Sequence, residues 1–86
     1  MPSLSTLAGL LPGRKARVSS IGLSGGIRRR LLDSGLREGA QLECIGRSPL
    51  GSPSAYLISD ALIAIRRSDS EQILVQPLEE VTGPWD

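Results

Sequence analysis

The sequence contains no histidine and no phenylalanine, and it has one cysteine, one tyrosine and one tryptophan. Without histidine, a Ser-His or Cys-His catalytic pair cannot form. One cysteine cannot close a disulfide within the chain, which is typical of proteins in a reducing compartment. With aromatic residues at 2% of the chain, the core has to be built from Leu, Ile, Val and Ala. These absences exclude common hydrolase chemistry and favour a small aliphatic domain.

Long apolar segments and phosphate-binding motifs are missing as well. No apolar run reaches the roughly 18 residues of a membrane-spanning helix. Residues 1–12 lack the charged start and continuous apolar stretch of a signal peptide. The glycines around positions 25 and 35 have neither the Walker lysine pattern nor the G-x-G-x-x-G spacing. We therefore expect a cytoplasmic protein that does not span a membrane and is not an enzyme.

Potential metal ligands are limited to Cys44 and scattered carboxylates. No Cys/His cluster with zinc spacing exists, so we expect no required cofactor and only a weak or shared Fe(II) or Zn(II) contact. A buried cysteine behaves as a small apolar group, which is the favoured interpretation of Cys44. Metal sensing through Cys44 and carboxylates, across a homodimer, stays open as an alternative.

Charge is distributed unevenly although the net charge is only +1. Residues 1–37 carry seven basic residues against one acidic residue, and residues 38–86 carry three against eight. Such asymmetry can mark an anionic partner, but in a small fold the two halves can also neutralise each other, which we favour. A small nucleic-acid-binding barrel is the alternative. Because single-strand binding needs aromatic platforms and Tyr56 alone lies in the expected barrel, we expect no nucleic acid partner.

Turn residues divide the chain into about five short strands with one or two short helices. The expected strands cover residues 14–21, 40–46, 54–58, 61–66 and 73–75. Residues 3–10 predict a helical turn, and residues 26–34 predict a short helix that Gly35 ends. The alternation in residues 40–46 places Leu42 and Cys44 on one face.

Two local irregularities complete this pattern. A bulge near Ser19-Ser20 restores the apolar phase of the first long strand, and Ser59-Asp60 predict a tight hairpin turn. Residues 77–86 are polar and predict a loose tail, so the domain covers residues 1–76. Because closure removes exposed sheet edges, the sequence predicts a mainly β fold in the form of a small barrel.

Two exposed features suit contact with a partner. In residues 48–53, Pro49 and Pro53 fix φ and Gly51 permits the bend, so Leu50 lies on a stiff loop that loses little entropy on docking. Such a loop can equally just cap the barrel. In the short helix we expect Arg28 and Arg29 to point outward, as a solvated face or as residues that steer an acidic partner. The candidate partner-binding residues are Arg28, Arg29, Pro49, Leu50, Gly51 and Pro53.

Four segments, in order, resemble the FeoA family of bacterial ferrous iron uptake. Residues 28–45, "RRRLLDSGLREGAQLECI", resemble the family signature of Arg, Leu and two framing glycines before a strand. The signature positions are occupied by Arg28 or Arg29, Leu31, Leu32, Gly35, Leu36 and Gly39. "SPLGSP" at 48–53 is similar to the family's Pro-Leu-Gly-Asp-Pro loop, with Ser52 where Asp is usual. Residues 6–18 and 61–75 resemble its opening and closing segments, so the resemblance spans residues 4–76.

This resemblance implies an SH3-like β-barrel with a small helix. It implies a non-catalytic accessory to the FeoB permease, an inner-membrane ferrous iron transporter with a cytoplasmic G-protein domain, and an association with transition metal ions. Homo-oligomers stay open. A similar barrel forms the C-terminal module of iron-dependent repressors, so a metal-sensing module is a further alternative, although no DNA-binding domain accompanies the barrel here.

Overall fold

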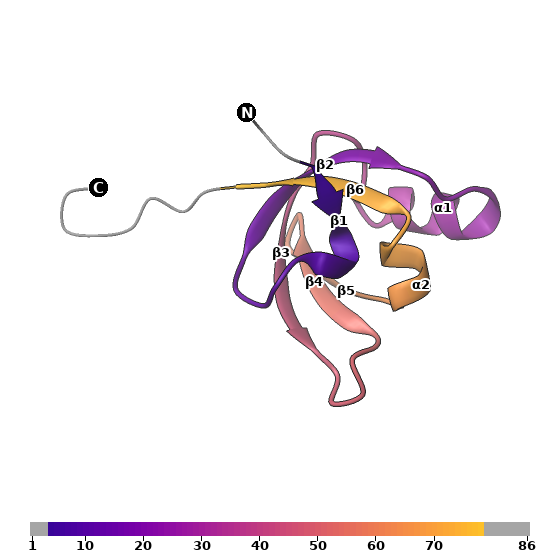
Figure 1. Cartoon of the computed structure of the whole chain (residues 1–86). Coiled ribbons are helices and arrows are strands. Elements are labelled where there is room, and N and C mark those ends of the chain that lie inside the picture. The colour runs from indigo at the N-terminus through magenta and orange to yellow at the C-terminus, as the bar shows by residue number, and fades with distance from the viewer. Residues whose placement is uncertain (1–3, 79–86) are drawn as a thin grey trace, which may run out of the picture.

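Within residues 4–78, the part of the chain that this computed structural model describes, six antiparallel strands form one sheet that curls around a single core (Figure 1). The order across the sheet is β1-β6-β2-β3-β4-β5. The elements in chain order are β1 (Ser5–Thr6), the 3-10 turn η1 (Leu7–Gly9), β2 (Lys15–Ile21), α1 (Gly25–Asp33), β3 (Gln41–Arg47), β4 (Ser54–Ile58), β5 (Ala61–Ile65), α2 (Arg67–Ser70) and β6 (Ile73–Pro77). The mainly β, SH3-like barrel expected from the sequence is confirmed.

The core is aliphatic, as the composition requires. Alternate residues of the strands point inward, so β3 buries Leu42 and Cys44 while Ile45 stays exposed. A register shift between Val18 and Ser20 confirms the predicted bulge. The buried apolar residues are Leu7, Leu10, Ala16, Val18, Ile21, Leu23, Leu31, Leu36, Leu42, Cys44, Tyr56, Ile58, Ile65, Ile73 and Val75.

The end of α1 explains the first framing glycine. Gly35 has φ +108, a backbone conformation that favours glycine. The Gly35 amide donates to the Leu32 carbonyl at 3.0 Å and the Leu36 amide donates to the Leu31 carbonyl at 2.9 Å, which is the Schellman arrangement. Leu31 and Leu36 are both buried, so the helix stop also anchors α1 to the barrel.

The structure corrects the sequence prediction at both ends of the domain. Ser5 and Thr6, expected in a helical turn, pair with β6 as a two-residue strand, and only Leu7–Gly9 form the turn. This sixth strand forms because β6 pairs with β2 along one edge and leaves its other edge for β1. Pro77, assigned to the tail, ends β6 opposite Ala16, where a strand end tolerates its missing N–H. The rest of the expected tail beyond Leu78 lies outside the described residues.

The sheet keeps two ends, β1 and β5. No ladder between described residues joins them; η1 contacts α2 at this seam instead. The expectation that closure removes every sheet edge is therefore wrong for β5. At the start of β5, Ser59 and Asp60 have φ of 49 and 68, which confirms the predicted two-residue hairpin.

Candidate partner-binding surface

The loop between β3 and β4 projects from the barrel and is held by its own hydrogen bonds (Figure 1). The Ser48 hydroxyl donates to the Ser52 carbonyl at 2.6 Å. The Ser48 amide donates to the Pro53 carbonyl at 3.1 Å, and the Gly51 amide donates to the Ser48 carbonyl at 2.8 Å. Gly51 has φ +89, as its position in the bend requires. The loop is therefore ordered before any partner arrives.

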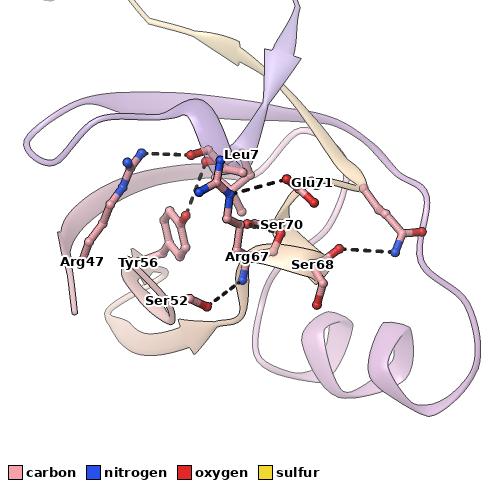
Figure 2. A network of polar contacts seen from close by, with 10 residues as sticks. Leu7, Arg47, Ser52, Tyr56, Arg67, Ser68, Ser70 and Glu71 are labelled. Carbon is pink, nitrogen blue, oxygen red and sulfur yellow. Dashed lines mark hydrogen bonds and ion pairs between the residues drawn. The ribbon is translucent and has the colours of Figure 1, made fainter. Parts of the chain in front are cut away.

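A further bond ties the loop to α2. The Ser52 hydroxyl accepts a hydrogen bond from the Arg67 amide at 3.0 Å (Figure 2). Arg67 opens α2, where backbone amides lack partners within the helix. Ser52, which stands where the resemblance has Asp, thus supplies an acceptor without carrying a charge.

The base of the loop is fixed to the N-terminal segment. The Arg47 guanidinium donates to the carbonyls of Ala8 at 2.9 Å and Leu10 at 3.0 Å. The buried Tyr56 hydroxyl donates to the Leu7 carbonyl at 3.4 Å. Figure 2 shows Arg47 and Tyr56 converging on this segment from the two strands that carry the loop. The loop therefore stands on a rigid base.

At the tip of this loop lies an unusually exposed leucine. Leu50 is 95% exposed, more than any other large apolar residue that the structure describes. Pro49, Gly51 and Pro53, the other candidate residues of the loop, are exposed as well. This geometry matches the predicted position of Leu50 on a stiff, exposed loop.

The two arginines of α1 differ in their environments. Arg29 is exposed, as expected. Arg28 is only half-exposed, and its guanidinium donates to the Ile21 carbonyl at 3.0 Å, so the expectation that it points outward is wrong in part. The bond arises because the first turn of α1 follows β2 closely and turns Arg28 back toward the end of that strand. A hollow of about 580 Å³ beside them is lined by Gly25, Gly26, Arg28, Arg29, Leu32 and Asp33.

Of the candidate loop residues, Pro53 lines a hollow together with α1. No residue of the loop lines the hollow beside Arg28 and Arg29. A second hollow of about 430 Å³ brings Pro53 together with α1, β5 and α2; its other lining residues are Ile27, Arg30, Leu31, Ala64, Ile65, Arg66 and Asp69. Sequence reasoning missed Arg66 and Asp69, although their spacing of three residues fits the ion pair that joins them at 3.6 Å.

The groups that could bind a metal ion at this surface are few among residues 4–78. Cys44 is fully buried and burial raises the pKa of its thiol, so it offers no thiolate to a metal ion at the surface. Among residues 4–78, no group of three or more Cys, Asp or Glu could hold a metal ion. The described residues therefore do not fit a resident metal centre. No helix of residues 4–78 has the length and apolar character needed to cross a bilayer.

Comparison with known proteins gives consistent matches. The FeoA domain model matches residues 5–77. The solution structure of FeoA from Chlorobium tepidum is 35% identical, with a TM-score of 0.83 over 92% of this chain and 75% of that one. A FeoA-like protein from Clostridium acetobutylicum is 26% identical, with a TM-score of 0.81 over 96% of each chain. FeoA from Stenotrophomonas maltophilia, solved with zinc, is 25% identical, with a TM-score of 0.71 over 83% of this chain and 88% of that one.

Two further comparisons bound this result. No curated protein sequence matches the chain. A manganese-dependent transcriptional repressor shares the fold at 18% identity, with a TM-score of 0.79, but the match covers 91% of this chain and only 44% of the repressor. The family match over residues 5–77 and the 35% identity to a FeoA structure show that this chain belongs to the FeoA family of ferrous iron transport accessory domains.

Proposed function

We propose that this protein is a cytoplasmic accessory of ferrous iron uptake that binds a FeoB-type permease through loop 48–53 and modulates its transport. The observation that carries this proposal is the exposure of Leu50, at 95%, on a loop that three internal hydrogen bonds and the Arg67 amide hold in place. Large apolar side chains at such positions are anchors at protein interfaces when a partner pocket covers them.

The rigidity of the loop matters for affinity. Binding costs free energy whenever flexible side chains or loops become ordered. Because this loop is preformed, more of the free energy gained by burying Leu50 contributes to the affinity. Full burial of a leucine side chain contributes about 1.5–3 kcal/mol. The loop therefore presents one well-placed anchor, and its tip carries no charged side chain that would oppose burial in an apolar pocket.

Arg28 and Arg29 supply a different contribution. They lie on α1 beside a hollow that loop residues do not line, so they form a separate contact area. Arg29 is exposed and Arg28 is half-exposed. Charges near the rim of an interface chiefly accelerate encounter with an oppositely charged partner and add little to the final affinity. We expect an acidic surface on the permease to face α1.

Modulation follows from selective binding. A partner shifts the equilibrium between two states of the permease only by its difference in affinity for those states. The protein therefore acts by favouring one conformation of the permease's cytoplasmic domain, without chemistry of its own. A weak Fe(II) or Zn(II) contact shared between chains remains compatible with this role, since zinc accompanies the Stenotrophomonas maltophilia relative.

The test is titration calorimetry with the permease from the same organism. The full chain is titrated into the cytoplasmic G-protein domain without nucleotide, with GDP and with a non-hydrolysable GTP analogue, and into the whole permease in lipid nanodiscs. We expect binding whose dissociation constant differs between nucleotide states. Absence of a binding signal in all three nucleotide states of the domain and with the whole permease in nanodiscs would contradict the proposal.

A further inference from the structure

The second end of the sheet, β5, is an open edge. β5 (Ala61–Ile65) pairs with β4 on one side, and no described residue pairs with its other side. The opposite end, β1, has only two residues. An open strand edge presents unpaired N–H and C=O groups, which makes it a template for another strand.

The register fixes which backbone groups face outward. Ile58 and Ala61 flank the two-residue turn and therefore exchange both of their hydrogen bonds. In an antiparallel ladder the bonded pairs alternate, so Ala61, Ile63 and Ile65 bond to β4. The N–H and C=O groups of Leu62 and Ala64 point away from the sheet, and they make no hydrogen bond within residues 4–78.

Nothing in β5 protects this edge. Natural edge strands are usually interrupted by lysine, proline or a bulge, or are very short. The sequence of β5, Ala-Leu-Ile-Ala-Ile, has none of these, and its pairing with β4 has no register shift. Leu62 is 66% exposed on the outer face, and Ala64 is exposed beside it. A hollow of about 430 Å³ lies beside Ala64 and Ile65 at the end of the strand, and it is lined also by Ile27, Arg30 and Leu31 of α1.

The residues that flank β5 carry opposite charges. Asp60 precedes the strand and Arg66 follows it, and both are exposed. In an antiparallel pairing of two β5 strands centred on Ile63, Leu62 of one copy faces Ala64 of the other, so all outward backbone groups of both residues become paired. The same register places Asp60 of each copy beside Arg66 of the other, whose guanidinium also lies 3.6 Å from the Asp69 carboxylate of its own chain. Opposite charges at facing positions stabilise strand pairs, whereas like charges oppose them.

We propose that two copies of this chain associate through their β5 edges in this two-fold antiparallel register. In this register, the β5 edge of one copy pairs the outward backbone groups and the flanking charges of the same edge in the other copy. A two-fold interface requires this kind of self-complementary surface. On the outer face, the exposed Leu57 and Leu62 of one copy continue into the exposed Ala64 and half-buried Ala55 of the other, so an apolar row becomes continuous across the pair.

Sedimentation velocity over about a hundredfold range of protein concentration tests the association, because the dimer fraction rises with concentration. We expect a dimer in the wild type. Ala64→Pro removes an outward N–H without touching the ladder to β4, and Leu62→Lys adds a charge to the edge. Each should raise the dissociation constant about tenfold or more. Leu4→Lys, at an exposed leucine outside β5, is the matched control and should leave the dimer unchanged.

A crosslink tests the register itself. Ile63 faces Ile63 of the second copy in a pair without backbone hydrogen bonds, where Cα atoms lie about 4.5 Å apart, close enough for a disulfide. Ile63→Cys should therefore yield a reducible covalent dimer on mild oxidation, and buried Cys44 should not compete. A wild type that stays monomeric throughout, a dimer that survives both edge variants, or an Ile63→Cys chain that does not crosslink would overturn the proposal.

Discussion

Replacing Leu50 separates folding from binding, because its side chain contacts almost nothing in the free protein. Its side chain is 95% exposed, so Leu50→Ser removes almost no contact in the free protein. The free energy of unfolding should therefore stay within about 0.5 kcal/mol of the wild type, as for surface substitutions in general. The hydrogen bonds that shape the loop involve Ser48, Ser52 and Pro53 and do not depend on the leucine side chain.

The loss should appear in binding. Full burial of a leucine contributes about 1.5–3 kcal/mol, and about 1.4 kcal/mol corresponds to a tenfold change in affinity. Leu50→Ser should accordingly weaken binding to the permease's cytoplasmic domain by about tenfold to about a hundredfold. Calorimetric titration gives the dissociation constant, and urea denaturation of the same sample gives the stability.

Leu4→Ser is the matched control, since Leu4 is 53% exposed and lies outside the loop. It should bind the permease as the wild type does. If Leu50→Ser binds equally well, the loop is only a cap on the barrel. If the free energy of unfolding of Leu50→Ser is lower than that of the wild type by more than about 1 kcal/mol, the reasoning from exposure is wrong, because substitutions at exposed sites do not cost that much.

Three further predictions concern stability. Gly35→Ala should lower the free energy of unfolding by about 1–3 kcal/mol, because φ +108 strains any residue with a side chain; unchanged urea denaturation would contradict this. Arg47→Met should cost about 1–2 kcal/mol by losing two hydrogen bonds to carbonyls, and amides near η1 should exchange faster. Burial raises the pKa values of Cys44 and Tyr56 above their ordinary 9.0 and 10.0. The unfolded chain then loses these protons first, so stability should be flat below about pH 8 and fall as pH rises past these values. Cys44→Ala and Tyr56→Phe should each flatten the alkaline fall in thermal melts; an unchanged slope would refute the assignment.

Local patterns in the sequence predicted the parts of the fold that local physics determines. Gly35 marks the helix end because positive φ is a property of that one residue, and Leu42 and Cys44 face inward because strand side chains alternate. The hairpin at Ser59-Asp60 was also predicted from single residues, because Asp tolerates the positive φ that a tight turn requires. Leu50 was predicted to lie at the tip of a stiff loop from Pro49, Gly51 and Pro53 around it.

Contacts between distant residues were not predictable. β1 has two residues and no periodicity, and it is a strand only because β6 lies beside it. Arg47 reaches a carbonyl 39 residues earlier in the chain, and nothing in its neighbours indicates this. The bond from Arg28 to Ile21 and the position of Pro53 opposite α1 likewise depend on how the elements assemble.

The place of β6 in the sheet has a consequence for how the protein is made. β6, the last strand among residues 4–78, lies between the first two strands, and its Ile73 and Val75 are fully buried there. A growing chain that has reached α2 therefore holds β2 with β3 on one side only, and β1 without any neighbour in the sheet. Completion of the sheet must therefore wait for residues 73–77 to leave the ribosome, and it depends on long-range pairings of the kind that slow the folding of β-rich domains.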